Sequence, residues 1–370
     1  MRVRDQMRRE VAALDRPAHG GDGWRTAGVE DFSANLNPYG PPPGLEGMIA
    51  EAAAGLDHYP DDASSVFKEA VAERMGVEPS NVIAGAGSSE LIRLFPEVFL
   101  ERGDRVLIPR PSFMEYSFAC RFMGAEVVPF ELEEGSFRPD VDRMLSSLGP
   151  GFKAAYLCTP NNPTGVTTPR ADVLRLAEEL EDMGVLLFLD ETLLELTQGE
   201  EGLTCAREAR RHPNLLIARS LTKSYAIPGF RSGYGIAHQD MVAALDAGRQ
   251  TWNLGHLEQV VSARLMRERH HHVRRAVEVL ARERDRAHRR LQDMGARAHR
   301  PDAFYFFLDV GPAGHDGASF KRAMLERKVA VRDCRSFGPP YQRYVRFCVK
   351  TPDRDDLLLE ALQAVWTEGR

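Results

Sequence analysis

The chain alternates short apolar runs with longer amphipathic stretches, and this alternation constrains its fold more than any other feature. The apolar runs have the length of strands and lie at residues 82–84, 106–108, 127–128, 154–157, 185–189 and 215–217. Helical patterns separate several of them, at residues 88–100, 112–123, 170–183 and 204–211. Because the runs are continuously apolar, helices should cover both faces of the sheet. We therefore expect an α/β fold with a mostly parallel sheet, whose ligands bind beyond the carboxyl ends of the strands.

The last third of the chain has a different pattern. Residues 264–300 carry twelve arginines on an apolar spacing that predicts one long amphipathic helix. Strand-like runs at 304–308 and 345–349 follow, and then a final helix at about 354–367. This α+β pattern predicts a second, smaller domain. We expect residues 1–45 to form an N-terminal arm that packs against the active site and the small domain. Residues 46–250 should form the large domain and residues 251–370 the small domain.

The composition is that of a globular protein without a nucleic-acid or membrane partner. The net charge is −6, and no apolar run reaches membrane-spanning length. The five cysteines are odd in number and widely spread, which favours a reducing cytoplasm over disulfides or a zinc site. His270, His271 and His272 face different directions on a helix, so we expect a solvated face there and no metal.

The segment RSLTKSYAIPGFR, at residues 219–231, carries the strongest chemical signal. Lys223 follows an apolar run and is flanked by the hydroxyls of Ser220 and Thr222, and a Pro-Gly turn brings Arg231 back toward it. A lysine whose pKa is lowered can form a Schiff base with an aldehyde. The hydroxyls and the arginine can hold a phosphate. An aldehyde and a phosphate in one small molecule describe pyridoxal phosphate.

Four further positions bear on such a cofactor. The run Gly85–Glu90 follows a strand and opens a helix, an arrangement that suits a phosphate. Phe113 can stack on an aromatic ring, and Asn162 of the NNPTG turn can bond a phenolate oxygen. Asp190 ends the strongest strand, where a carboxylate can pair with a pyridinium nitrogen and keep the ring protonated.

Together and in this order, these motifs resemble the fold-type I pyridoxal-phosphate enzymes of the aspartate aminotransferase superfamily, from residue 19 to near the C-terminus. The resemblance implies a large domain with a mostly parallel seven-stranded sheet, a smaller α+β C-terminal domain and a homodimer. It implies that Lys223 carries the cofactor, Asp190 pairs with the ring nitrogen, Asn162 contacts the ring's 3-oxygen and Phe113 stacks on the ring. The implied phosphate ligands are Ser88, Ser89, Ser220, Thr222, Arg231 and the partner subunit's Tyr59.

The resemblance also implies a substrate site. Arg346, in YVRF, matches the arginine that holds the substrate carboxylate, and Arg332 is a second guanidinium fork suited to carboxylate or phosphate. His19, Ser33 and Asn35 of the arm are candidates to complete a phosphate pocket.

Two neighbouring families share this frame, the L-threonine-O-3-phosphate decarboxylases of cobalamin synthesis and the histidinol-phosphate aminotransferases. Several segments resemble the decarboxylases: HGG at 19–21, DFSANLNP at 31–38, FMEY at 113–116, the lysine segment, and VRDCRSF at 331–337. Leu193 stands where the aminotransferases usually have a tyrosine that bonds the 3-oxygen. The first expectation is therefore decarboxylation of L-threonine O-3-phosphate to (R)-1-aminopropan-2-yl phosphate. The alternative is transamination of histidinol phosphate with 2-oxoglutarate.

Other functions also remain open from the sequence. One is a relaxed phosphoserine or serine decarboxylase. Another is a non-catalytic regulator that uses the arginine-rich helix, although five acidic residues are interspersed there and Lys223, Asp190 and Arg346 are intact.

Overall fold

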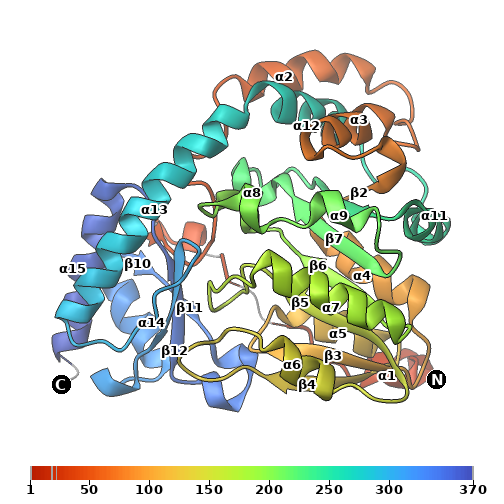
Figure 1. Cartoon of the computed structure of the whole chain (residues 1–370). Coiled ribbons are helices and arrows are strands. Elements are labelled where there is room, and N and C mark those ends of the chain that lie inside the picture. The colour runs from red at the N-terminus through yellow and green to blue at the C-terminus, as the bar shows by residue number, and fades with distance from the viewer. Residues whose placement is uncertain (1, 18–19, 22, 369–370) are drawn as a thin grey trace.

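A seven-stranded sheet forms the centre of the molecule (Figure 1). The computed structural model describes residues 2–17, 20–21 and 23–368. The strand order is β2-β8-β7-β6-β5-β3-β4. The strands are β2 Val82–Gly85, β3 Arg105–Arg110, β4 Glu126–Glu131, β5 Phe152–Cys158, β6 Leu186–Asp190, β7 Leu215–Ser220 and β8 Gly233–Ala237. The pairings from β7 to β4 are parallel, and β8 runs antiparallel to both β2 and β7, so the mostly parallel seven-stranded sheet is confirmed.

Helices cover both faces of this sheet, as the continuous apolar runs predict. Successive residues of β6 point to opposite faces: Phe188 packs with the core around α4 and α5, while Leu187 and Leu189 pack with the core around α7. The helices of this part of the chain are α4 Ser88–Phe99, α5 Met114–Phe122, α6 Val141–Ser146, α7 Arg170–Asp182, α8 Glu200–Leu203, α9 Ala206–Ala209, α10 Leu221–Ser224 and α11 Gln239–Gly248. The helix expected over 204–211 is thus only four residues long.

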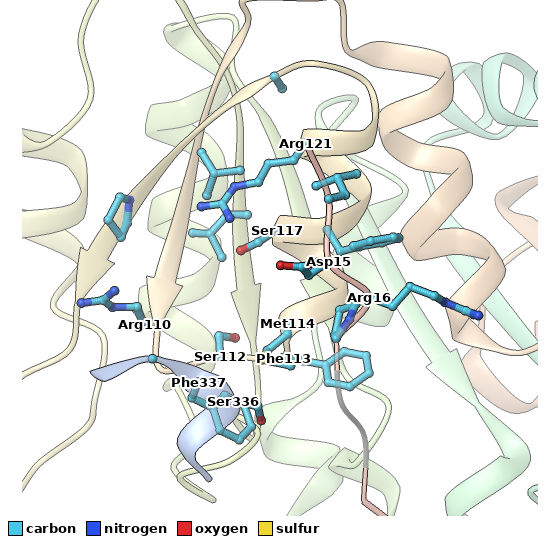
Figure 2. Close-up of a pocket in the computed structure, with 18 of the residues that line it drawn as sticks. Asp15, Arg16, Arg110, Ser112, Phe113, Met114, Ser117, Arg121, Ser336 and Phe337 are labelled. Carbon is cyan, nitrogen blue, oxygen red and sulfur yellow. The ribbon is translucent and has the colours of Figure 1, made fainter. Parts of the chain in front are cut away.

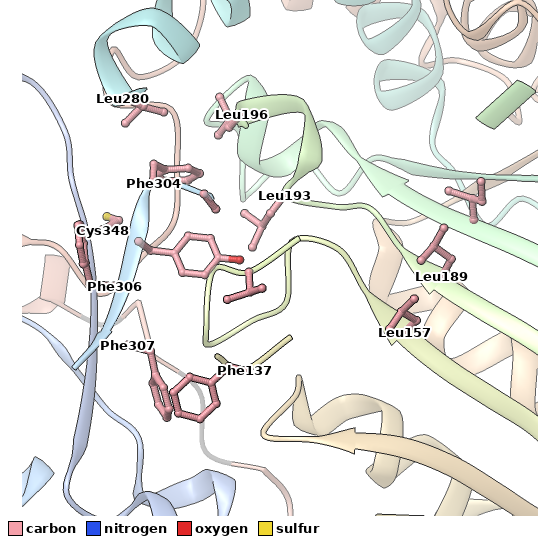
Figure 3. Packing of buried hydrophobic residues seen from close by; sticks show 14 of the residues in the cluster. Phe137, Leu157, Leu189, Leu193, Leu196, Leu280, Phe304, Phe306, Phe307 and Cys348 are labelled. Atoms are coloured by element: carbon pink, nitrogen blue, oxygen red, sulfur yellow. The ribbon is translucent and has the colours of Figure 1, made fainter. Parts of the chain in front are cut away.

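A second, antiparallel sheet has the order β11-β12-β9, with β9 Tyr305–Asp309, β11 Arg332–Asp333 and β12 Tyr344–Cys348. The helices of the same part of the chain are α14 Gly317–Glu326 and α15 Pro352–Glu368. The arm joins this region because β1 Glu30–Asp31 pairs in parallel with β10 Val329–Ala330. One buried core runs from Leu157 and Leu189 of the large sheet to the phenylalanines of β9 (Figure 3). We propose that the two sheets mark a large and a small domain.

The long amphipathic helix expected over 264–300 is confirmed only for residues 270–293. Two helices occupy the region, α12 His256–Glu268 and α13 His270–Asp293, and the chain bends between them at Arg269 (φ −120°, ψ 10°). The helix α12 packs against α2 Leu45–Ala52 and α3 Ser65–Met75, while α13 crosses to the side of α15 (Figure 1). Tertiary packing on two different surfaces therefore outweighs the continuous helical pattern.

The prediction that His270, His271 and His272 lie on a solvated face is wrong for two of them. His272 is buried and its Nε2 contacts the Gly40 carbonyl at 2.9 Å, and His270 pairs with Glu195. Of these three, only His271 is exposed.

The arm contains the one-turn helix α1 Arg9–Ala12. None of the helices in residues 2–17, 20–21 and 23–368 is long and apolar enough to cross a membrane.

Candidate active site

A cavity of about 1010 Å³ lies beyond the carboxyl ends of the large sheet's strands. The arm, the turns after β3, β5, β6 and β7, and the facing strands β11 and β12 enclose it. The residues of this lining that the sequence singled out are Ser33, Asn35, Phe113, Asn162, Leu193, Lys223, Arg332 and Arg346. Among the described residues, the cationic side chains that border it are Lys223, Arg332, Arg346, Lys350 and Arg354, and the carboxylate is that of Asp31. Lys350 and Arg354 pair with Glu30, which leaves Lys223 and the two other arginines as the cations that face a ligand. The cavity therefore suits a small anionic molecule.

Lys223 lies in the first turn after β7, in the four-residue helix α10. Burial, together with the charges of Arg346 and Arg231, lowers the pKa of this lysine to about 8. The arm fixes the turn from outside: the Asn37 N–H donates to the Lys223 carbonyl at 3.0 Å, and the Asn37 side chain donates to the Ser224 carbonyl at 2.8 Å. The amine is therefore a nucleophile with a substantial neutral fraction near neutral pH.

Asp190 is buried at the end of β6, where only 5% of the residue is exposed. The Tyr116 hydroxyl of α5 donates to Oδ2 at 2.6 Å, and the Thr192 N–H donates to Oδ1 at 2.8 Å. Burial raises the pKa of Asp190 above its ordinary value, while the hydrogen bonds and Lys223 act against this rise. A cationic nitrogen beside it would therefore be strongly favoured.

Five of the predicted phosphate ligands gather at the N-terminus of α4. Arg231 Nη2 donates to Ser89 Oγ at 3.0 Å, and Arg231 Nη1 contacts Thr222 Oγ1 at 3.5 Å. The Ser220 and Thr222 hydroxyls are 2.8 Å apart, and Ser88 opens the helix beside Ser89. The five residues Ser88, Ser89, Ser220, Thr222 and Arg231 are called the phosphate cup below.

Two glycines keep the phosphate cup open. Gly87 has φ +79°, and a side chain there would collide with the Arg231 guanidinium. A Cβ on Gly233 would lie 2.6 Å from the backbone nitrogen of Ser88. The Pro228 carbonyl accepts from Arg231 at 3.0 Å, and Pro228 lines the cavity, so the phosphate cup lies directly beside it.

Arg346 makes hydrogen bonds to two parts of the cavity wall. Its Nη1 donates to Asn162 Oδ1 at 2.6 Å, and its Nη2 donates to the Ser33 carbonyl. Its buried Nε has no hydrogen-bond partner among the described residues, and neither does the buried Oδ1 of Asn35. Buried polar atoms without partners are rare, so these two are places where a ligand would complete the hydrogen bonding.

Arg332 lies directly opposite Arg346 in the register of β11 and β12. Both residues are only 8% exposed. Two guanidinium groups on the same face of a strand pair can hold an anionic ligand by charge-assisted hydrogen bonds. Arg332 also donates to Ser336 Oγ at 3.1 Å and lies under the arm, where a Cβ on Gly20 would be 2.8 Å from its Cδ.

Ser33 and His19 are the two other arm residues predicted to bind the substrate. Ser33 is buried and positions the arm: its hydroxyl donates to Asp31 Oδ1 at 2.6 Å and accepts the Gly21 N–H at 3.0 Å. His19 lies outside the described residues, so its predicted role is untested.

Phe113 borders two cavities. Its ring meets Tyr116 edge to face at 5.6 Å. Besides the cavity above, it lines a neighbouring one of about 740 Å³ between the arm, α5 and the loop at Ser336–Gly338, into which Arg121 points (Figure 2). Met114 and Phe337 line both cavities as well, so the two lie side by side.

Tyr59, the sixth predicted phosphate ligand, does not line the cavity of its own chain. It is 73% exposed and stacks on Trp252, with ring centroids 4.1 Å apart.

Sequence reasoning missed three contributors to the site. Tyr116 lies three residues after Phe113, one helical turn along α5, which is a signal that could have pointed to it. Asn37 sits in the segment DFSANLNP, but nothing local shows that it holds the lysine turn. Lys350 follows β12 and faces the cavity.

Comparison with known proteins agrees with this geometry. The family model described as aminotransferase class I and II matches residues 27–362. A histidinol-phosphate aminotransferase of Symbiobacterium thermophilum is 33% identical over 348 residues, 93% of each chain. A protein of Caldanaerobacter subterraneus subsp. tengcongensis named "Putative threonine-phosphate decarboxylase" is 30% identical, covering 91% of this chain and 90% of that protein. Six further relatives, 25–28% identical, are also named histidinol-phosphate aminotransferases.

Solved structures with a similar fold include a protein of the same name. The structure of a histidinol-phosphate aminotransferase from Sinorhizobium meliloti in complex with pyridoxal 5′-phosphate superposes with a TM-score of 0.85 over 98% of each chain, at 23% identity. The motifs, the sheet and the family match all agree, and the chain belongs to the aminotransferase class I and II family.

Proposed function

We propose that this chain is a pyridoxal-phosphate enzyme acting on a small phosphorylated amino compound, with transamination of histidinol phosphate as its first candidate reaction. The observation that carries the proposal is the pair of buried arginines, Arg332 and Arg346, facing each other in the cavity of Lys223. Seven relatives named as histidinol-phosphate aminotransferases support transamination better than the decarboxylation that the motifs first favoured.

The residues present fit the cofactor. The phosphate cup offers hydroxyls, a guanidinium and a helix N-terminus, and its two glycines leave room for a ligand. The buried carboxylate of Asp190 suits the ring nitrogen, Asn162 the 3-oxygen and Phe113 one ring face. When bound, pyridoxal phosphate supplies an electron sink for the charge that develops at the substrate's α-carbon.

The chain's own residues would bind the substrate and move its proton. Lys223 Nζ, with its pKa at about 8, can accept and return a proton at the α-carbon. Arg346 offers its Nε to the phosphate of histidinol phosphate or to the carboxylate of glutamate, and Arg332 offers a second fork to the same anion. Leu193 has no hydroxyl, and its apolar side chain helps to exclude water from this edge of the cavity.

Decarboxylation of L-threonine O-3-phosphate is the second candidate. One observation favours it: Leu193, which lines the cavity, has no hydroxyl to bond the 3-oxygen. Two facing guanidinium groups can also hold the phosphate and the carboxylate of one amino acid at once.

We also propose a cytoplasmic homodimer in which Tyr59 reaches the partner's phosphate cup. The exposure of its ring supports this arrangement.

Two assays on the cofactor-loaded protein separate the candidates. One measures glutamate formed from histidinol phosphate and 2-oxoglutarate, and the other measures CO₂ released from L-threonine O-3-phosphate. We expect glutamate without CO₂, and Lys223→Ala should abolish it. CO₂ without glutamate would instead establish the decarboxylase, and failure of the protein to bind pyridoxal phosphate would refute both.

A further inference from the structure

A buried ion pair lies behind the site, on the reverse side of the strands that carry it. Glu191 follows Asp190 at the end of β6, and Arg219 precedes Ser220 in β7. The Glu191 side chain is 0% exposed and the Arg219 side chain 3%. Neither residue is used by the chemistry proposed above.

The register of β6 and β7 explains how this pair faces away from the cofactor. Asp190 pairs with Ala218, and the Glu191 N–H donates to the Ala218 carbonyl at 2.9 Å. Because successive side chains of a strand point to opposite faces, Asp190 and Ser220 lie on one side while Glu191 and Arg219 lie on the other.

The pair is fully satisfied by hydrogen bonds. Arg219 Nε and Nη2 donate to Glu191 Oε2 at 2.9 and 2.8 Å, and Nη1 donates to Glu200 Oε1 at 2.6 Å. Thr204 and the Cys205 N–H donate to the same Glu191 carboxylate at 2.7 and 3.0 Å. A buried, complete network of this kind fixes the positions of its members.

We propose that the Glu191–Arg219 pair is a positioning device that sets the place of Asp190 relative to the phosphate cup and the Lys223 turn. Each member is covalently adjacent to a residue of the proposed cofactor site, so a change in their separation moves the two sides of that site apart. The inference rests on the proposed pyridoxal-phosphate function and deepens it.

The test uses variants of the cofactor-loaded protein with a matched control. Arg219→Lys keeps the charge but loses the planar fork. The double variant Glu191→Gln with Arg219→Met removes both charges, and this replacement is often tolerated in buried pairs. The control is Arg284→Met: Arg284 is 6% exposed and donates to Asp285 and to the Asp302 carbonyl, residues outside the cavity lining.

Three quantities are measured for each variant: the dissociation constant of pyridoxal phosphate, the pH midpoint of the bound cofactor's absorbance change, and the melting temperature. For both Arg219 variants we expect the dissociation constant to rise by about tenfold, and the pH midpoint to shift by roughly half a unit or more. Arg284→Met should change only the melting temperature. Glu191→Gln alone should shift the midpoint in the same direction as the double variant.

The outcomes are distinguishable. A lower melting temperature with unchanged cofactor affinity and pH midpoint would mean that the pair is merely structural, and would overturn the inference. If Arg219→Lys does not fold, the double variant decides by the same two readouts. Wild-type protein that does not bind the cofactor would instead refute the proposed function, and this inference with it.

Discussion

Replacing Tyr116 by phenylalanine tests whether its hydroxyl holds Asp190 in the ionised form. The change removes a 2.6 Å hydrogen bond to a buried carboxylate and leaves the bond from the Thr192 N–H in place. The ring keeps its contacts with Phe113, Tyr156 and Phe188, so no cavity forms.

The magnitude follows from the charge of the acceptor. A hydrogen bond to a charged group contributes about 1.5–3 kcal/mol, so its loss should raise the pKa of Asp190 further. For 370 residues, an unfolding entropy of about 2.1 cal/mol/K per residue converts this loss into a melting temperature lower by about 2–4 °C.

The effect should depend on pH. The pKa of Asp190 in the folded protein is already raised by burial, so this group contributes stability at low pH that is lost as pH rises through the folded pKa. The variant has a still higher folded pKa and loses stability over a wider range. Its deficit relative to wild type should therefore be smaller at an acidic pH than at an alkaline pH.

Calorimetric melting of the cofactor-free protein at both pH values measures this deficit. Tyr156→Phe is the control, because this equally buried hydroxyl accepts a hydrogen bond from the neutral Cys120 thiol at 3.4 Å and, within the part of the chain that the structure describes, bonds no carboxylate. Its deficit should not change with pH. A Tyr116→Phe deficit that is equal at both pH values would refute the reasoning.

Three further changes have defined outcomes. Arg346→Lys removes the fork that reaches Asn162 and the Ser33 carbonyl, and should lower kcat/KM on the order of 100-fold in the assay that proves active, without unfolding the protein. Gly87→Ala places a side chain at φ +79° against the guanidinium of the phosphate cup, and should weaken pyridoxal phosphate binding by roughly tenfold in a fluorescence titration. Burial, with the charge of Glu283, raises the pKa of Asp355 to about 8, so stability is lost as pH rises from about 4 through about 8. Asp355→Asn should reduce the difference in unfolding free energy between about pH 6 and pH 9, measured by urea unfolding, and an unchanged difference would contradict the prediction.

The features that local sequence determines were predicted well. The six apolar runs of the large sheet are strands, and the phosphate cup forms from two short segments whose turns bring the hydroxyls and Arg231 together. The strand β8 was missed as a run because GYGIA contains two glycines and has little strand propensity of its own.

Contacts between distant segments could not be predicted in this way. The opposition of Arg332 and Arg346 depends on the register of two strands, which neither segment encodes alone. Tyr116 and Asp190 are 74 positions apart, and Arg346 and Asn162 are 184 apart. The bend at Arg269 likewise comes from packing on two surfaces, because the helical periodicity continues through it.

The arm grips the site largely through main-chain atoms. Arg346 bonds the Ser33 carbonyl, and the Asn37 N–H bonds the Lys223 carbonyl. Every residue type supplies a carbonyl and all but proline supply an N–H, so these two bonds do not depend on the arm's side chains, whereas the bond from the Asn37 side chain to the Ser224 carbonyl does. Relatives could thus diverge in the side chains that the arm presents to the cavity while keeping the Lys223 turn in place. We therefore expect that exchanging the arm's cavity-lining side chains between homologues, with Asn37 kept, would alter the cavity lining and leave the Lys223 turn attached.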